Sequence, residues 1–357
     1  MKESSSSKGR KGPAKAAPPA PNQPVSLKQL AAHLGLNAAT VSVVLNDVPG
    51  RSIPQTTRDR IKAAAREMNY QPSLLARSLR NKRTLTIGVL IPQLGDGYHA
   101  QVMSGIGDEL INSGYFYFTA HHGHRKDLIE EYTRIFIGRG AQGILAVDTA
   151  LDHPVSVPVV AISGHRHIDG VTNVVLDHRC AAKLALDHLY SQGHRSIAFM
   201  RGQPFSSDAD DRWNQFAAAA RKLGLTIDPN LVVALDRNVT SPEVGYPVVQ
   251  QLRASGKPFT AVVAFNDIYA MGAIRALLDL NLRVPEDVSV IGFDDIHAAA
   301  YTMPRLTTIR QPLEEMGRTA VRTLLDRING AASSPEEIAV TPELIVRDST
   351  GPAPRLK

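Results

Sequence analysis

The chain has 357 residues, of which 43% are hydrophobic and 21% charged, an ordinary composition for a soluble globular protein with a small domain and a larger, two-lobed one. A single cysteine, Cys180, excludes a disulfide framework and favours a reducing compartment, so we expect a cytoplasmic protein. No apolar run is long enough to span a membrane, and the first 24 residues lack the apolar centre of a secretory signal.

Positive charge is concentrated near the N-terminus. Residues 1–84 hold 15 Lys and Arg against 4 Asp and Glu, a net charge of +11, whereas the rest of the chain holds 25 against 30, a net charge of −5. Residues 1–24 are rich in Ser, Pro, Ala and Lys, so we expect a disordered basic tail that either adds non-specific DNA affinity or acts as a plain linker. The asymmetry indicates a nucleic-acid-binding head on a neutral-to-acidic body.

Residues 25–70 are expected to form three short helices. Ser26 and Gln29 have the spacing of a capping box, and apolar side chains then recur at helical spacing up to Gly35. Asn37 is placed to cap a second helix, and Thr57 to cap a third. Two helices joined by a glycine turn of this length are typical of a helix-turn-helix, in which the first helix holds the start of the second in the major groove.

From residue 85 onward, apolar runs alternate with helical stretches. Such runs predict parallel strands buried on both faces, an α/β doubly wound architecture whose ligand site lies at the carboxyl ends of strands. The runs are LTIGVLI (85–91), YFYFTA (115–120), GILAV (143–147), VPVVAI (157–162), SIAFM (196–200), FTAVVAF (259–265) and SVIGF (289–293).

Six blocks, in one order from residue 25 to about 348, together resemble the lactose-repressor/galactose-repressor family. The blocks are SLKQLAAHLGLNAATVSVVLND, TTRDRIKAAAREMNYQPSLLARSLRNKRTLTIGVLIP, GHRSIAFMRG, FNDIYAMGAIRALLD, VPEDVSVIGFDD and PRLTTIRQP. The resemblance implies a homodimeric repressor that reads a pseudo-palindromic operator in double-stranded DNA. It also implies a small-molecule effector, a sugar or related metabolite, and no cofactor. Whether that effector is an inducer or a corepressor stays open.

The resemblance also divides the chain into domains. It implies a helix-turn-helix domain at 25–70, a hinge helix at 71–84, a core like the periplasmic sugar-binding proteins at 85–348 and a flexible tail at 349–357. The core has two α/β lobes joined by crossovers. The first holds residues 85–178 with a return near 310–342, and the second holds residues 179–309 and the last strand, ELIVRD.

The second helix of the head carries the residues that read bases in the family. Where the family commonly has an arginine or a similar polar residue, this chain has Val43, which offers only an apolar contact such as one to a thymine methyl group. We therefore expect an operator half-site that does not depend on an arginine–guanine pair at this position; the alternative is a helix that binds DNA weakly. Thr40 and Ser42 can donate to phosphates.

Two further segments are expected near DNA. The loop 47–55 is two residues longer than in well-known members of the family, and its Arg51 is either a DNA contact or a solvated loop charge. The hinge segment LLARSLRNK places Leu79 where the family inserts an apolar wedge into the minor groove; the alternative is a core or dimer contact. The expected DNA contacts are Ser26, Ala38, Ala39, Thr40, Ser42, Val43, Asn46, Arg51, Ala76 and Leu79.

Effector contacts are expected where polar residues follow strands. Arg212, Asn266, Asp294 and Gln311 match family ligand positions, and Phe265 or Trp213 could stack on a ring. Each polar residue alone could instead be a helix cap or a surface group, as Asp267 could cap its helix. The expected effector contacts are Asp96, Tyr98, His121, Arg212, Phe265, Asn266, Asp294 and Gln311.

The first lobe matches the family more loosely, because GDGYH (95–99) replaces the usual polar-aromatic run. Five histidines near strand ends make a metal site conceivable, but no helical pair or partnered cysteine supports one, so no metal is expected. These are His121, His122, His124, His165 and His167.

Two other classes of protein share some of these features. A sugar-binding transport protein would need a secretory signal and would have no DNA-binding head. An enzyme would be expected to carry a motif such as G-x-G-x-x-G after a strand, a P-loop, G-x-S-x-G or H-E-x-x-H, and none is present. The sequence therefore favours a regulator over both.

Overall fold

The computed structural model describes residues 25–47, 51–71, 83–95, 97–164, 168–203, 206, 208–235, 241–331 and 335–355. The chain divides into two compact units, residues 1–84 and residues 85–357.

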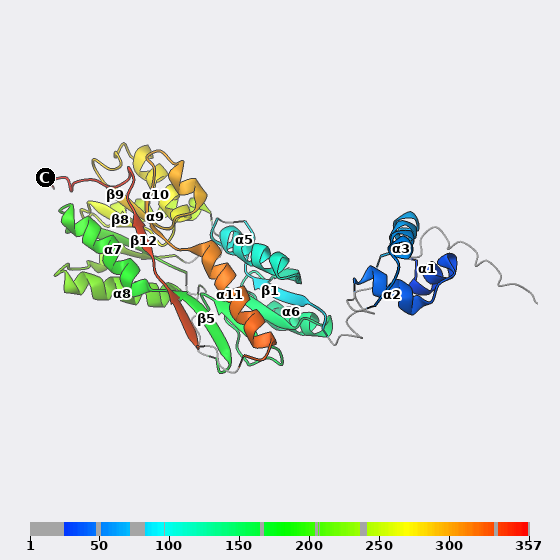
Figure 1. Cartoon of the computed structure of the whole chain (residues 1–357). Coiled ribbons are helices and arrows are strands. Elements are labelled where there is room, and N and C mark those ends of the chain that lie inside the picture. Colours follow the sequence, from blue (N-terminus) through cyan, green and yellow to red (C-terminus); the bar gives the residue numbers. More distant parts are fainter. Residues whose placement is uncertain are drawn as a thin grey trace, which may run out of the picture. The chain divides into compact units, whose positions relative to one another are not determined.

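The first unit contains α1 (Leu27–Leu34), α2 (Ala38–Leu45) and α3 (Gln55–Glu67), shown in blue in Figure 1. The capping box is confirmed: the Ser26 hydroxyl accepts from the Gln29 N–H, and the Gln29 side chain accepts from the Ser26 N–H. Gly35 ends α1 with a φ of 65°, a conformation that costs a glycine little. Asn37 caps α2 by accepting from the Ala39 N–H at 2.8 Å.

The prediction that Thr57 caps α3 is wrong. The helix begins at Gln55 with Pro54 as its N-cap, and no side chain caps it. Proline has no N–H to satisfy and its φ is already close to helical, so it can precede a helix without a polar cap. Ile61 and the buried alanines of α3 pack against Leu30, Val41 and Val44, which joins the three helices around one small core.

The first lobe of the second unit is built on a six-stranded parallel sheet in the order β11-β5-β4-β3-β1-β2. Its strands are β1 (Thr86–Ile91), β2 (Phe116–His121), β3 (Gly143–Val147), β4 (Val159–Ile162), β5 (Val171–Leu176) and β11 (Glu337–Val340). Helices α5 (Gly97–Asn112) and α11 (Leu313–Ile328) pack on one face, and α6 (Lys126–Gly138) packs on the other.

The second lobe has a sheet in the order β12-β10-β9-β8-β6-β7, parallel except for β12, which pairs antiparallel with β10. Its strands are β6 (Ile197–Arg201), β7 (Val232–Ala234), β8 (Ala261–Val263), β9 (Ser289–Asp294), β10 (Thr307–Arg310) and β12 (Glu343–Ile345). Helices α7 (His178–Ser191) and α8 (Ala209–Lys222) cover one face, and α9 (Pro242–Ala254) and α10 (Asp267–Asp279) cover the other. Short 3-10 turns lie at Pro229–Leu231 and His297–Ala300.

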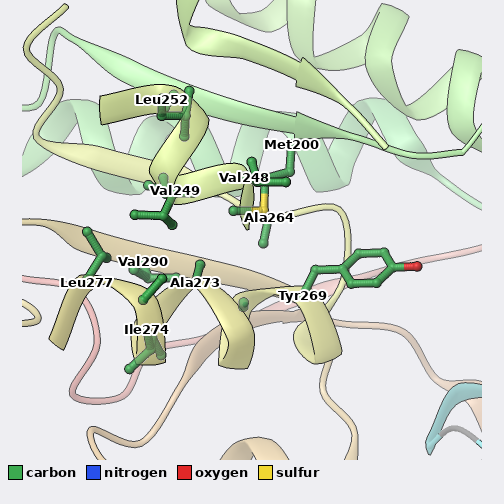
Figure 2. Packing of buried hydrophobic residues seen from close by; sticks show 14 of the residues in the cluster. Met200, Val248, Val249, Leu252, Ala264, Tyr269, Ala273, Ile274, Leu277 and Val290 are labelled. Carbon is green, nitrogen blue, oxygen red and sulfur yellow. The ribbon is translucent and has the colours of Figure 1, made fainter. Parts of the chain in front are cut away.

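The pair α9 and α10 packs unusually closely. A Cβ on Gly245 would lie 2.1 Å from the Tyr269 carbonyl oxygen, and one on Gly272 would lie 1.9 Å from the Pro242 carbonyl oxygen. Backbone can approach backbone at these points only because glycine has no side chain. Figure 2 shows the apolar side chains of both helices meeting Met200 and Val290 from the sheet.

Three connections join the two lobes: β5 to α7, β10 to α11, and β11 to β12. This is the two-lobed doubly wound architecture expected from the sequence. The strand β5 was not anticipated, since its Thr172 and Asn173 interrupt the apolar pattern. The short strands β7 and β11 were also missed.

Candidate ligand cavity and nucleic-acid interface

A polar cavity of about 60 Å³ lies between the two lobes of the second unit, where strands of both sheets end. A topological switch point at strand carboxyl ends is where ligands bind in open α/β sheets. The cavity is lined by Gln93, Tyr98, His99, His124, Asp148, Ser163, Gln203, Ser206, Asp208, Arg212, Phe265, Asn266 and Asp294.

Arg212 is the central cation of the second-lobe wall. Its guanidinium donates to the Asp208 carboxylate at 2.7 Å and to the Phe265 carbonyl oxygen at 2.7 Å. It also lies 4.4 Å from the centre of the Phe265 ring and 3.8 Å from that of the Phe293 ring. Because Arg212 and Asp208 are both buried, the charge pair and the two rings hold the guanidinium plane in one orientation.

The Asp208 carboxylate has a second partner on α7. His178 Nε2 lies 3.5 Å from an Asp208 oxygen, and the imidazole is also buried. The first turn of α7 therefore supports the cavity wall from behind.

Asp294, the last residue of β9, presents its carboxylate from a strained backbone. Its φ is 113°, a value that side-chain-bearing residues rarely adopt. The Gln311 side chain donates to an Asp294 carboxylate oxygen at 2.6 Å. Gln311 lies on the connection between β10 and α11, so a lobe crossover fixes the carboxylate that faces the cavity.

Asp267 lies behind this wall and is fully buried. Its two oxygens accept from the Thr308 hydroxyl at 2.6 Å and the Ile296 N–H at 2.9 Å. Burial, followed by the nearby Asp294 charge, raises the pKa of Asp267 well above its ordinary value. The suggestion that Asp267 caps α10 is wrong, since Asn266 is the cap and accepts from the Tyr269 N–H at 2.9 Å.

The first-lobe wall is formed by residues at the ends of β3 and β4 and by the start of α5. The Tyr98 hydroxyl donates to the Ser163 hydroxyl at 2.9 Å, and His99 Nε2 lies 3.7 Å from an Asp148 oxygen. Asp148 and Ser163 have φ values of 41° and 55°, so both strands end in left-handed turns that direct these residues to the cavity. Burial, and then the charges of Asp208 and Asp148, raises the pKa of the Tyr98 hydroxyl.

His124 reaches the cavity from the loop after β2 and is held by His122. The His124 N–H donates to His122 Nδ1 at 3.1 Å, which places the His122 proton on Nε2, 2.8 Å from the Thr149 hydroxyl. Burial, followed by the neighbouring histidines, lowers the pKa of His122 to about 3. His122 is therefore a neutral structural group at physiological pH.

The lining is richer in acids than in bases. Among the described lining residues, Asp148, Asp208 and Asp294 supply three carboxylates against the one guanidinium of Arg212. Carboxylates accept hydrogen bonds and repel anions. The arrangement suits a ligand with several hydroxyl or N–H donors and no phosphate or carboxylate.

The structure brings together five of the residues expected to bind an effector: Tyr98, Arg212, Phe265, Asn266 and Asp294. Gln311 stands behind Asp294 and does not line the cavity. His121 is exposed at the end of β2, the edge strand of its sheet, and does not line the cavity. Trp213 packs on Phe199 instead of lining the cavity. Asp96 lies outside the described residues.

Eight lining residues were not anticipated: Gln93, His99, His124, Asp148, Ser163, Gln203, Ser206 and Asp208. Asp148 and Ser163 directly follow the runs GILAV and VPVVAI, so the rule that pointed to Asp294 would have found them. His99 and Asp208 carry no such signal, because they depend on how α5 and α8 approach the sheet ends.

The exposed side of α2 is the candidate nucleic-acid interface of the first unit. Val41 and Val44 are buried, whereas Val43 is partly exposed and lies outside the three-helix core. Ala39 is exposed and Thr40 is partly exposed, and α2 carries no charged side chain. This helix can offer hydroxyls and methyl groups to DNA.

The end of α2 and the loop that follows supply polar groups. The Asn46 amide donates to the Ser42 carbonyl oxygen at 2.7 Å, which orients Asn46 along the helix. Ser26 is exposed at the start of α1, and Arg51 is exposed in the loop before α3. The hinge residues Ala76 and Leu79 lie outside the described residues.

Two further properties bear on the kind of protein. Within the described residues, no group of three or more His, Cys, Asp or Glu is placed to hold a metal ion; His165 and His167 lie outside them. In the part of the chain that the structure describes, no helix is both long and apolar enough to cross a bilayer.

Comparisons with known proteins give matches over both units. Residues 26–73 match the model of bacterial regulatory proteins of the lacI family, and residues 186–350 match a periplasmic binding protein-like domain. The HTH-type transcriptional repressor PurR of Haemophilus influenzae is 32% identical over 336 residues, covering 91% of this chain and 98% of the relative. The protein of the same name from Erwinia tasmaniensis is 32% identical over 338 residues, covering 92% and 98%.

Solved structures are also similar to this chain. The lac repressor dimer bound to operator and the anti-inducer ONPF superposes with a TM-score of 0.82 at 26% identity, covering 92% of this chain and 100% of that one. The regulator CelR in complex with cellobiose gives 0.66 at 27% identity, covering 91% and 99%. A lacI-family regulator from Enterococcus faecium with bound ribose gives 0.66 at 28% identity, covering 75% and 100%.

Proposed function

The chain belongs to the lacI family of bacterial regulatory proteins, and from this premise we propose that it is a dimeric repressor whose operator affinity is set by a small polyol between its two lobes. It is a DNA-binding transcriptional regulator with an effector-binding core. The single observation that supports the effector proposal best is the acid-rich cavity at the lobe boundary. We assign no catalytic role and no cofactor to the protein. Because its target is DNA, we place the protein in the cytoplasm.

We assign base reading to the start of α2. Ala38, Ala39 and Val43 offer methyl groups for thymine, and Thr40 and Ser42 offer hydroxyls to phosphate. Ser26, Asn46 and Arg51 flank this surface and would contact the backbone. The other domain limits proposed from the sequence are kept: tail 1–24, head 25–70, hinge 71–84 and a core from 85. The proposed flexible tail 349–357 is shortened at its start, because Ser349 is buried and donates to the Val290 carbonyl oxygen at 2.6 Å, so the core extends past 348. Leu79 remains the proposed wedge in the minor groove.

The proposed effector is a neutral sugar or a related polyol. Cellobiose and ribose occupy two structural relatives, and both are neutral polyols. Three carboxylates around one guanidinium offer many acceptors for hydroxyl donors, and the Phe265 ring offers an apolar face for a sugar ring. A phosphorylated or carboxylated ligand would meet the repulsion of Asp148, Asp208 and Asp294.

A ligand between the lobes acts by favouring one angle between them. It changes DNA affinity only if it binds the DNA-competent and incompetent forms unequally. Gln311 ties Asp294 to the crossover before α11, so a ligand that pulls on Asp294 acts directly on a hinge. The segment 71–84 would pass the change to the head.

The partner proposed for the dimer is a second copy of the chain. Large apolar side chains are exposed on the second lobe: Tyr301 is 87% and Met303 89% accessible, and Leu278 and Leu280, at the end of α10, are 42% and 43% accessible. Exposed apolar surface can mark a contact surface. The structural relative bound to operator is itself a dimer.

The test measures operator binding by fluorescence anisotropy with the full chain, with and without a panel of neutral sugars, sugar phosphates and sugar acids. We expect only the neutral sugars of the panel to change the affinity for the operator. The variant Asp294→Ala should bind DNA as the wild type does but lose the response, whereas Asp210→Ala, at an exposed position on α8, should keep it. A response to anionic sugars only, or a normal response by Asp294→Ala, would contradict the proposal.

A further inference from the structure

A second cavity opens on the outer face of the first lobe, and it is larger than the one between the lobes. Its volume is about 250 Å³, compared with about 60 Å³. It lies between α6 and the connection from β3 to β4. The lining residues are Lys126, Ile129, Glu130, Thr133, Arg134, Ala150, Leu151, Asp152, His153 and Val155.

The cavity arises from a departure in the chain's topology. In a doubly wound sheet a helix normally joins consecutive parallel strands. Residues 148–158, all of them described, run from β3 to β4 without a helix. On this face α6 covers the sheet beside β1, and loop residues such as Leu151 and Val155 cover the rest. A loop fills the space beside α6 less completely than a helix would.

The interior of this outer cavity is apolar. Ile129 and Leu151 are buried in its floor, and Ala150 and Val155 are partly buried in its walls. The Thr133 hydroxyl donates to the Ile129 carbonyl oxygen at 2.7 Å, so it is already satisfied within α6. The outer cavity therefore presents no convergent polar groups to a sugar. A ligand with apolar surface would gain free energy by burying that surface in the cavity.

The rim is charged and balanced. Lys126 and Arg134 oppose Glu130 and Asp152, all four are exposed, and the Lys126 amine lies 3.2 Å from an Asp152 oxygen. A macromolecule docking here would have to desolvate all four charges. A small molecule can enter the apolar interior and leave them in water. The balanced rim selects neither an anion nor a cation.

The same connection joins the two cavities. It begins at Asp148, which lines the cavity between the lobes with a φ of 41°, and two residues later its Ala150 lines the outer cavity. A molecule wedged against Leu151 and Val155 would press on a segment whose first residue faces the proposed effector.

We infer that the outer cavity is a second ligand site, for a small, uncharged and mainly apolar molecule such as a monocyclic aromatic alcohol. This ligand class differs from the polyol proposed for the cavity between the lobes. The inference does not depend on that proposal, since it rests on the outer cavity alone.

The experiment uses the full chain with labelled Ile, Leu and Val methyl groups, titrated with benzyl alcohol and followed by methyl NMR. We expect saturable shifts at Ile129, Leu151 and Val155. The described lining of the cavity between the lobes has no Ile, Leu or Val, so benzyl alcohol bound there would not place its ring against these three side chains and would give its largest shifts elsewhere. The absence of saturable shifts, or shifts confined to other methyl groups, would overturn the inference.

Variants test the site independently. Val155→Phe fills the cavity and should weaken benzyl alcohol binding at least about tenfold, which corresponds to about 1.4 kcal/mol. Ala150→Leu fills it from a second lining position and should do the same. Ile135→Phe, on α6 but outside the lining, should bind as the wild type does. Retained binding in both filled variants, or loss in Ile135→Phe, would place the molecule elsewhere.

Discussion

Replacing Arg212 by Met tests how much of the second lobe depends on one buried charge pair. The change keeps the length and the apolar stem of the side chain but removes its charge. It removes the guanidinium that lies 2.7 Å from the buried Asp208 carboxylate, while His178 Nε2 stays 3.5 Å from the same carboxylate.

The expected loss follows from burial. Both side chains of the pair are less than a tenth exposed. Removing one partner of such a pair costs about 3–5 kcal/mol, because the other buried charge loses its nearest opposite charge in a poor solvent. Loss of the contacts to the Phe265 and Phe293 rings adds to the cost. The double variant Arg212→Met with Asp208→Asn also removes the charge of the Asp208 carboxylate, so it should recover much of the lost free energy of unfolding.

The matched control is Arg275→Met on α10. Arg275 and Asp279 have the same four-residue separation and lie 2.8 Å apart, but Arg275 is 71% exposed. An exposed pair contributes about 1 kcal/mol or less. Urea unfolding at one protomer concentration is followed by the fluorescence of Trp213, the single tryptophan, which lies on α8. If Arg212→Met costs no more than the control, or the double variant is no more stable than Arg212→Met, the reasoning is refuted.

Four further outcomes are expected. Because the pKa of Asp267 is raised, the folded chain keeps this proton to higher pH than the unfolded chain does. The contribution of Asp267 to the free energy of unfolding therefore declines as pH rises from about 4. In urea titrations across pH, Asp267→Asn should remove that decline. The pH dependence caused by His122, whose pKa is about 3, runs in the opposite direction. The free energy of unfolding declines as pH falls below about 6.5, because the unfolded chain takes up a proton that the folded chain does not. His122→Gln should reduce this decline at low pH. In DNA titrations, Val43→Ala should weaken specific binding but leave the salt dependence unchanged. Arg51→Ala should weaken all binding and lower the salt slope by about one; an unchanged slope would make Arg51 a solvated loop charge.

Local chemistry explains which elements the sequence predicts well. The ends of α1 and α2 follow from the hydrogen-bonding capacity of Ser26, Gln29 and Asn37, and from the backbone freedom of Gly35. The start of α3 does not follow, because Thr57 looks like a cap. The helix begins instead at Gln55, directly after Pro54, and has no side-chain cap. A favourable cap residue shows where a helix can start and does not require it to start there.

The cavity is predictable to the extent that it follows strand ends. Arg212, Asn266 and Asp294 stand near such ends in the sequence, and the structure places all three in the lining. His121 also ends a strand, yet β2 turned out to be the edge of its sheet, and strand order is a property of the whole fold. Gln311 could be placed near the cavity from the sequence, but its role behind Asp294 depends on a contact between distant segments.

Operator reading is tested most directly by selecting bound duplexes from a random DNA library with the full-length protein at near-physiological salt, with and without neutral sugars. We expect an enriched pseudo-palindrome with half-sites about one helical turn apart, an easily deformed central step, and enrichment that changes with one of the sugars. No enriched sequence under any of these conditions would contradict the claim that this chain reads an operator under the control of a small polyol.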